Sequence, residues 1–360
     1  MAILDLSASA VDLTREICDI DSVSGNERLL ADAVEQAVGR LAHLEVSRFG
    51  DTIVARTHLG RASRVVIAGH LDTVPSNGNL PTSFETIDGV EYLWGRGTVD
   101  MKAGVAVQLK LAAELTSPSV DLTWIWYDHE EVSESLNGLN RLSQSHPELL
   151  AGDLAILGEP TRAEIEGGCN GNLRAEIRSR GLRAHSARSW VGDNAIHRAA
   201  PILATLAGYR AQEVEVDGLV YRESLSAVGI RGGVAGNVIP DECMVHINYR
   251  FAPSRTAEQA VAHIRDLFQG YEVSIVDLAE GARPGLDSAL ARDFVAAVGG
   301  TAKPKFGWTD VARFSRLGVP AVNYGPGDPL KAHADDERVA LEQITACEEG
   351  LRAWLSTPAR

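Results

Sequence analysis

The sequence predicts an α/β protein in which a smaller α+β domain is inserted into a larger one. Strands alternate with helices in residues 1–172 and again in 283–360, which is typical of a mostly parallel sheet with helices on both faces. Between these parts, residues 173–282 follow the order β-α-β-β-α-β of a ferredoxin-like domain. We therefore expect one discontinuous α/β domain and one inserted ferredoxin-like α+β domain.

Composition and charge exclude several classes of protein. The chain has 360 residues, enough for two hydrophobic cores. Its net charge of −15 argues against nucleic acid or an anionic membrane as a partner, although local arginines could still bind an anionic substrate. The residues from Met1 to Asp12 carry no basic region before an apolar core, which argues against a secretory signal. With four scattered cysteines, we expect reduced thiols in a cytoplasmic protein.

The elements of the first part follow from periodicity and from turn residues. Apolar side chains at helical spacing, or runs rich in alanine and leucine, predict helices over 11–20, 27–41, 103–115 and 136–144. Short apolar or β-branched runs predict strands over 44–49, 52–57, 65–70, 122–127 and 154–157. Glycine and asparagine mark loops at 76–79 and 88–89.

The insert and the last part are predicted in the same way. Strands are expected over 173–178, 225–230, 245–251 and 272–276, and helices over 194–206 and 256–268. Thr256 and Gln259 form a capping box at the start of the second helix. The strand at 245–251 alternates cleanly, so Arg250 lies on its polar face. The last part is expected to contain a helix over 289–298, a strand over 319–324, a turn at 325–328 and a terminal helix over 341–355.

Three predicted strands end in histidine or acidic residues. His70 closes the first, Glu130 and Glu131 follow the second, and Glu159 follows the third. Open α/β sheets bind ligands at the carboxyl ends of their strands, so these side chains should converge. Several carboxylates in one place repel one another unless a cation lies between them. The sequence therefore predicts a metal site at this edge of the sheet.

Five residues are candidate metal ligands. Mixed imidazole and carboxylate donors suit zinc, cobalt or manganese better than magnesium. A catalytic zinc usually keeps three protein ligands, so five candidates fit two metals that share one carboxylate. In this hypothesis Asp100 is shared, one metal has His70 and Glu159, and the other has Glu131 and His333.

Neighbouring residues could supply the chemistry. Asp72 lies two positions after His70, so in an extended segment its carboxylate could fix the tautomer and direction of the imidazole. A Glu-Glu pair is usually a solvated loop, but here it follows an apolar strand aligned with two others that carry ligands. Glu130 then fits a general base for a metal-bound water that attacks a carbonyl. His185 is either an exposed loop histidine or a hydrogen-bond donor to an oxyanion.

The motifs together resemble the M20-type dinuclear metallohydrolases. The matching pieces occur in family order and span nearly the whole chain: residues 69–75, 95–102, 130–131, 158–161 and His333. The resemblance implies two zinc ions per subunit, with cobalt as a possible substitute, and Asp100 as the bridging ligand. It also implies that Asp72 orients His70, that Glu130 is the base and that the Asp100–Met101 peptide bond is cis.

Further stretches are similar to actinobacterial members of this family that hydrolyse N-succinyl-LL-2,6-diaminopimelate. These stretches are 183–190, 192–197, 232–241, 248–253 and 307–314. The resemblance implies a homodimer formed through 173–282, which also acts as a lid and sends His185 and Asn237 into a neighbouring active site. It implies substrate contacts from Asn237, Arg250, Thr309 and Gly325. The alternatives are another acyl-amino-acid hydrolase, such as an acetylornithine deacetylase, and a non-catalytic ligand-binding relative.

Overall fold

The structure is a computed structural model that describes residues 3–357. The chain divides into two compact units. The first comprises Met1–Gly167, Pro284–Lys303 and Thr309–Arg360, and the second comprises Gly168–Arg283 and Pro304–Trp308. Residues 168–172, 283 and 304–308, which the sequence assigned to the larger domain, thus belong to the second unit. Residues 1–2 and 358–360 of the expected larger domain lie outside the described residues.

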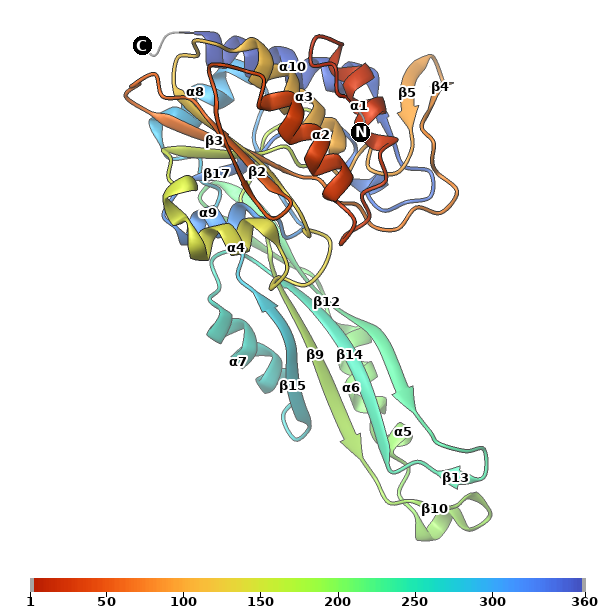
Figure 1. Ribbon diagram of the computed structural model, residues 1–360. Helices are drawn as coiled ribbons and strands as arrows, with labels where there is room; N and C mark the ends of the chain where they lie inside the picture. Colours follow the sequence, from red (N-terminus) through yellow and green to blue (C-terminus); the bar gives the residue numbers. More distant parts are fainter. Residues whose placement is uncertain (1–2, 358–360) are drawn as a thin grey trace. The chain divides into compact units, whose positions relative to one another are not determined.

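The first unit is built on an eight-stranded sheet (Figure 1). Its four central strands, β6, β3, β7 and β17 in that order, are parallel, whereas β1, β2 and β8 pair antiparallel at the sides. In spatial order the strands are β1 (Glu45–Phe49), β2 (Thr52–Arg56), β6 (Asp121–Tyr127), β3 (Arg64–His70), β7 (Leu154–Leu157), β17 (Ala321–Asn323), β8 (Glu166–Gly167) and β16 (Lys303–Pro304).

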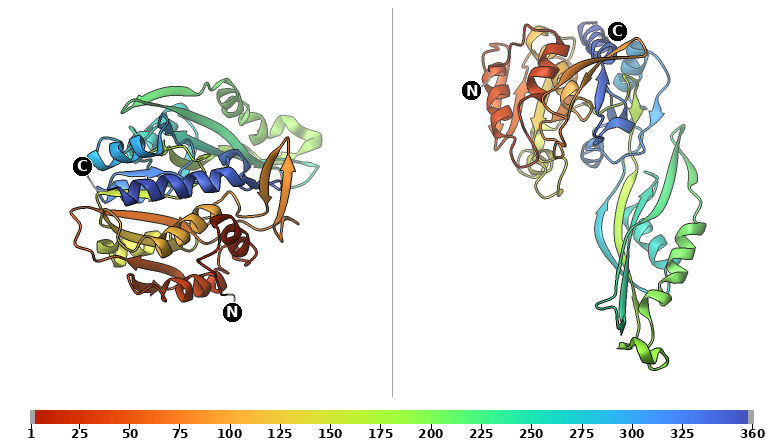
Figure 2. Two further views of the ribbon diagram at one scale, coloured as in Figure 1. Left: turned by 90° about the horizontal axis from the view of Figure 1, so that it is seen from above. Right: turned by 90° about the vertical axis from the view of Figure 1, so that its right-hand side faces the viewer.

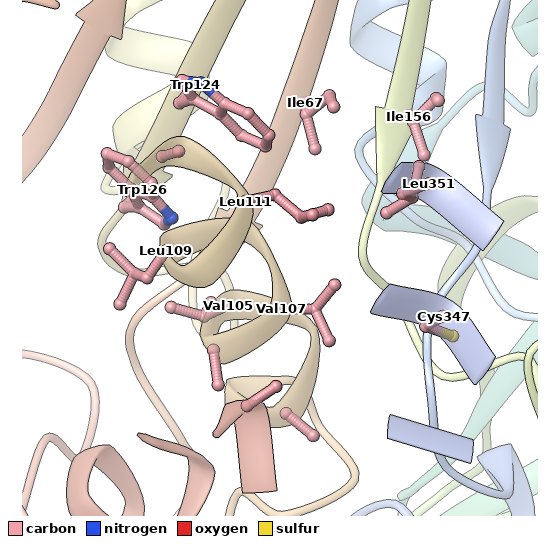
Figure 3. Close-up of a cluster of buried hydrophobic side chains, with 14 of the residues drawn as sticks. Ile67, Val105, Val107, Leu109, Leu111, Trp124, Trp126, Ile156, Cys347 and Leu351 are labelled. Atoms are coloured by element: carbon pink, nitrogen blue, oxygen red, sulfur yellow. The ribbon is translucent and has the colours of Figure 1, made fainter. Parts of the chain in front are cut away.

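Helices cover both faces of this sheet, as expected (Figure 1). One face carries α1 (Ala10–Cys18), α2 (Arg28–Val38), α3 (Lys102–Glu114), α8 (Ala289–Val298) and α10 (Leu341–Ser356), and the other carries α4 (Gly138–Ser145) and α9 (Val311–Arg316). α10 lies alongside α3 (Figure 2). Side chains of α3 pack among those of β3, β6 and α10 (Figure 3). Because β3 and β6 are buried on both faces, their carboxyl ends are fixed rigidly in the unit.

A three-stranded sheet beside the core was not expected from the sequence. It consists of β4 (Ser83–Ile87), β5 (Val90–Trp94) and β18 (Arg338–Ala340). The turn between β4 and β5 has positive φ at Asp88 (52°) and Gly89 (83°), the backbone that a two-residue hairpin requires. Since β18 pairs with β5, the loop before β18 lies next to the loop after β5. His333 and Asp100 are on these two loops.

The second unit contains a five-stranded antiparallel sheet with helices packed on one face. The order β12-β14-β9-β15, extended by β11, is that of a ferredoxin-like fold, so the expected fold class is confirmed. Its strands are β9 (Gly171–Arg180), β11 (Gln212–Val216), β12 (Leu219–Gly232), β14 (Glu242–Phe251) and β15 (Glu272–Ala279), and its helices are α5 (Ala195–Arg198), α6 (Ala200–Gly208) and α7 (Ala257–Leu267).

Local sequence signals explain the details of this unit. β14 alternates buried and half-buried residues because one of its faces packs on the helices. The capping box of Thr256 and Gln259 is present at the start of α7. The single helix expected over 194–206 is instead two helices that meet at Ala199, shortly before Pro201. A small pair of strands, β10 (Ala184–His185) and β13 (Val238–Ile239), completes the unit.

The described part of the chain has no helix that is both long and apolar enough to cross a membrane. All four cysteines are buried.

Candidate metal centre

Three of the expected ligands form a compact group at the carboxyl end of the central strands. His70 ends β3, Asp100 precedes α3, and Glu131 lies in the loop after β6. One donor atom from each lies within 4.8 Å of the others. His70 is almost fully buried, and its Nε2 is 3.1 Å from Asp100 Oδ1. Because parallel strands present their carboxyl ends on one edge, these residues meet although they are distant in sequence.

His333 joins this group from the opposite side of Asp100. Its Nε2 is 2.8 Å from Glu131 Oε1 and 3.3 Å from Asp100 Oδ2. Asp100 therefore presents one oxygen toward His70 and the other toward His333. Hydrogen bonds that His333 donates to the carboxylates of Asp100 and Glu131 raise its pKa to about 10. The carboxylates thus hold positive charge at the position of this imidazole.

Glu159 lies at the end of the neighbouring strand β7 and is buried. β7 pairs in parallel with β3, with Leu157 opposite Ala68, so Glu159 follows the same edge of the sheet as His70. Its carboxylate is close enough to Glu130 to raise the pKa of that group. Three of the five expected ligands therefore form one group, His333 contacts two of them, and Glu159 stands at the adjacent strand end.

The carboxylate of Asp72 holds the turn that carries Glu130 and Glu131. Its two oxygens accept the backbone N–H groups of Glu130 and Glu131, each at 3.0 Å, and the Ser24 hydroxyl at 2.6 Å. The imidazole Nδ1 of His70 is 2.9 Å from the Asp72 backbone carbonyl and 3.5 Å from its carboxylate. The main-chain carbonyl of Asp72 is thus the nearest group that fixes the direction of His70. The carboxylate of Asp72 instead positions the turn that carries Glu130 and Glu131.

Protonation of this cluster is governed by burial and by mutual repulsion. Burial raises the pKa of Glu130 well above its ordinary value. The charge on His70 opposes this rise, whereas the carboxylates of Asp310, Glu159 and Glu131 add to it. Burial also opposes ionisation of Asp72, but His70, Ser24 and the Glu130 N–H outweigh it and lower the pKa of Asp72 to about 2. Asp72 is therefore kept ionised, whereas Glu130 resists ionisation without a cation.

A buried ion pair that sequence reasoning missed supports both loops that carry the candidate ligands Asp100 and His333. Glu337 is fully buried, and its Oε1 accepts the N–H groups of Val99 (3.0 Å) and Asp100 (3.2 Å). Its Oε2 is 2.6 Å from an amino group of Arg96, whose other amino group donates to the His333 carbonyl at 3.4 Å. The spacing of four residues between His333 and Glu337 was the available signal. The pair ties the loop of Asp100 to the loop of His333.

Three expected site residues belong to the second unit. His185 is exposed on β10, and its Nδ1 accepts the N–H of Ala187 at 3.1 Å. Asn237 lies beside it, because its carbonyl accepts the N–H of Ser186 at 2.9 Å. Arg250 is half-buried on the polar face of β14, and its Nε donates to Asn248 Oδ1 at 3.1 Å. Within the described residues, Arg250 forms no ion pair with a carboxylate.

The last two expected substrate contacts lie in the first unit. Thr309 is buried, and its hydroxyl is 2.9 Å from Asn323 Oδ1. Gly325 follows β17, and its N–H donates to the Thr161 hydroxyl at 3.1 Å. A Cβ at Gly325 would lie 2.2 Å from the Gly158 carbonyl oxygen, so only glycine fits there. The Asp100–Met101 peptide bond is cis, as the family resemblance implied.

Two close relatives match this chain over almost its full length. It is 52% identical over 355 residues to a protein of Mycobacterium tuberculosis named putative succinyl-diaminopimelate desuccinylase DapE, with 98% of this chain and 99% of that protein covered. It is 48% identical over 364 residues to succinyl-diaminopimelate desuccinylase of Corynebacterium glutamicum, with 98% of each covered.

Solved structures share the fold at much lower identity. A tripeptidase from Staphylococcus aureus superposes with a TM-score of 0.78 at 19% identity and covers 99% of both chains. The YXEP protein of Bacillus subtilis, described as a dinuclear metal-binding peptidase of the M20 family, has a TM-score of 0.69 at 17% identity and covers 96% of both chains. The family model of peptidase family M20/M25/M40 matches residues 66–357. This match and the near-full-length relatives show that the chain, with its strand-end group of histidine and carboxylates, belongs to peptidase family M20/M25/M40.

Proposed function

We propose that this chain hydrolyses the amide bond of N-succinyl-LL-2,6-diaminopimelate to succinate and LL-2,6-diaminopimelate, a step toward lysine and diaminopimelate. The observation that supports this most strongly is the complete strand-end cluster in a chain that is 52% identical to a relative of that name. A non-catalytic relative on the same scaffold would be expected to lack a ligand or the base, and here each expected position is occupied.

The donor set fits two divalent cations per subunit, with zinc as our proposal and cobalt as a substitute. Imidazole and carboxylate donors suit these ions, and a cation offsets the repulsion among the buried carboxylates. Because Asp100 directs one oxygen toward His70 and the other toward His333, we assign it the bridging position. Glu159 would complete the set on the His70 side and Glu131 the set on the His333 side. Such cations polarise a carbonyl group and make water nucleophilic at neutral pH.

Glu130 is the proposed general base. It takes a proton as water attacks the amide carbonyl, and it returns the proton to the amine that leaves. Its backbone is fixed by the Asp72 carboxylate, so the Glu130 side chain starts from a defined position next to Glu131. His185 is proposed to donate a hydrogen bond to the oxyanion of the tetrahedral intermediate.

Arg250 is proposed to bind a carboxylate of the substrate. A half-buried guanidinium that pairs with no carboxylate among residues 3–357 keeps donors available for an anionic ligand. Burial lowers the pKa of Arg250, although a guanidinium stays protonated at neutral pH. Asn237, Thr309 and the main chain at Gly325 are the other proposed contacts. An acidic protein needs such local donors to hold a substrate with three carboxylates.

A homodimer formed through residues 173–282, which also act as a lid, is the proposed assembly. β11 pairs only with the first part of β12, so Ser224 to Gly232 pair on one side alone, with β14. This free edge carries the exposed apolar side chains of Val228 and Ile230. Edge strands of this kind pair readily with another chain. In the proposed dimer His185 and Asn237 of one subunit serve the active site of the other, in the cytoplasm.

The experiment is a comparison of two substrates with the purified, zinc-loaded protein. N-succinyl-LL-2,6-diaminopimelate and N-acetylornithine present the same amide chemistry, but only the first has a carboxylate on its acyl group. We expect kcat/KM to be higher for the succinyl substrate by at least roughly 100-fold, about 2.7 kcal/mol of transition-state stabilisation. Faster cleavage of N-acetylornithine would assign the chain to the acetylornithine deacetylases instead.

A further inference from the structure

A buried polar cluster holds the loop of residues 128–136, which carries Glu130, and the proposed chemistry does not use this cluster. We define the Asp310 cluster as Tyr127, Asn137, Asp310 and Arg313. All four residues are almost fully inaccessible to solvent. Arg313 Nε donates to Asp310 Oδ1, and its NH1 donates to Glu134 at 2.9 Å. Buried charges of this kind are costly to desolvate, and apolar residues of similar volume are often at least as stable. Stability alone therefore does not account well for the cluster.

One oxygen of Asp310 connects both ends of the loop that carries Glu130 and Glu131. Asp310 Oδ2 accepts the Tyr127 hydroxyl at 2.8 Å and the Asn137 side-chain amide at 3.0 Å. Tyr127 is the last residue of β6, and Asn137 is the N-cap of α4. The two ends of the loop between them are thus hydrogen-bonded to the same carboxylate oxygen.

The direction of these hydrogen bonds is fixed by chemistry. The Oδ1 of Asn137 accepts the backbone N–H of Asn140 at 2.9 Å, so its Nδ2 must face Asp310. A carboxylate can only accept, so Tyr127 donates its hydroxyl hydrogen. Since the N–H groups of Glu130 and Glu131 are held by Asp72, the loop is fixed at its middle and at both ends. Asp310 also follows Thr309 directly, a proposed substrate contact.

We propose that Asp310 is a positioning residue that sets the location of Glu130 relative to the bound amide, acting through Tyr127 and Asn137. The inference rests on the proposed function, because Glu130 matters only if it is the base. An error of about 1 Å in the position of a catalytic group can cost on the order of 100-fold in rate. Loss of one of the two hydrogen bonds should therefore reduce kcat rather than substrate binding or folding.

The test uses Tyr127→Phe and Asn137→Ser on the full-length, zinc-loaded protein. Tyr127→Phe removes one oxygen atom, and Asn137→Ser keeps a good helix cap while it removes the amide that binds Asp310. Tyr249→Phe is the matched control, because Tyr249 donates a buried hydrogen bond of 3.0 Å to Glu223 in the second unit. We expect kcat to fall roughly 10-fold or more in both loop variants, with KM within about 2-fold of wild type.

Two further readouts separate positioning from a general loss of structure. Metal content should stay at the wild-type value, and amide hydrogen exchange should increase within residues 128–136 in the loop variants only. Tyr249→Phe should lower the melting temperature by about as much as the two loop variants do, but it should leave kcat unchanged. Wild-type kcat in both loop variants, or an equal fall in kcat in Tyr249→Phe, would overturn the inference. Failure of the proposed function would appear differently, because the wild-type protein would then not cleave the succinyl substrate.

Discussion

Buried carboxylates that accept backbone N–H groups recur around the candidate metal centre. Asp72 holds the N–H groups of Glu130 and Glu131, and Glu337 holds those of Val99 and Asp100. Hydrogen bonds to an ionised acceptor are about twice as strong as neutral ones. In this protein they fix the main chain at the residues whose side chains form the site.

Replacement of Glu337 by glutamine tests this role. Glu337→Gln removes the negative charge that pairs with Arg96 and weakens the support for the Asp100 loop. We expect the free energy of unfolding of the metal-free protein to fall by about 3 kcal/mol, as when one partner of a buried ion pair is lost. Zinc affinity should fall by roughly 10- to 100-fold, as for other groups that orient metal ligands. Urea denaturation and competition with a zinc chelator measure the two effects.

The second unit offers a matched control for Glu337→Gln. Glu223 is also fully buried and accepts an arginine (Arg255, 2.7 Å) and a backbone N–H (Ala252, 3.0 Å). Glu223→Gln should lower stability in a comparable way without changing zinc affinity. If both variants bind zinc with wild-type affinity, Glu337 does not position the metal ligands.

The sequence allowed the ligands to be predicted better than the groups that support them. Side chains at the carboxyl ends of parallel strands must meet, so His70, Glu131 and Glu159 could be grouped without a structure. Asp310 and Tyr127 are 183 residues apart, and Glu337 and Val99 are 238 apart. No periodicity or motif spacing encodes such long-range pairs, because they depend on how separate loops pack.

At the level of elements, strand β6 is joined to the loop after β2 by its first residue, Asp121. Its carboxylate accepts the N–H groups of Leu59 and Arg61 and the Thr57 hydroxyl, each at 2.8 Å. Burial opposes ionisation of Asp121, but these three donors outweigh it and keep the pKa of this carboxyl below its ordinary value. The ionised carboxylate therefore fixes the amino end of β6, which is opposite to the end that carries the candidate metal centre.

This contact predicts a pH-dependent difference in stability between the wild type and Asp121→Asn. Because the pKa of Asp121 is lower in the folded state, its stabilisation is complete above the unfolded value of about 3.9 and is lost as the pH falls through the folded value. We expect Asp121→Asn to be less stable by about 1–3 kcal/mol at pH 7, with the difference shrinking below about pH 4. Urea denaturation of both proteins from pH 7 to pH 3 measures it. A difference that stays constant or grows toward low pH would contradict the assignment.

Long elements with clear periodicity were predictable, and short exposed ones were not. α3 and β3 were expected because one is rich in strong helix formers and the other is a β-branched run. The hairpin of β4 and β5 was read only as a loop at Asp88 and Gly89, because β4 is largely exposed and lacks an apolar face. Tertiary pairing with β18, which no local pattern encodes, completes that sheet.

At the scale of the whole molecule, the candidate metal ligands all belong to the first unit, whereas the proposed oxyanion donor and carboxylate-binding arginine belong to the second. The candidate metal ligands and the proposed base Glu130 are thus in one unit, and part of the proposed substrate-binding and oxyanion contacts are in the other. The family match covers the sequence of both, and the fold class of each unit was predicted correctly from element order. The second unit differs from the expected 173–282 by residues 168–172, 283 and 304–308, which no local sequence pattern assigns to it.

The central claim is that Glu130 acts as the base in a site that binds two metal ions. The most direct measurement is the turnover of N-succinyl-LL-2,6-diaminopimelate by wild type and Glu130→Gln, with zinc content determined on the same samples. We predict two zinc ions per subunit in both proteins and a fall in kcat of at least roughly 1,000-fold in the variant. Wild-type turnover in Glu130→Gln would contradict the account, as would a loss of activity explained wholly by a loss of bound zinc.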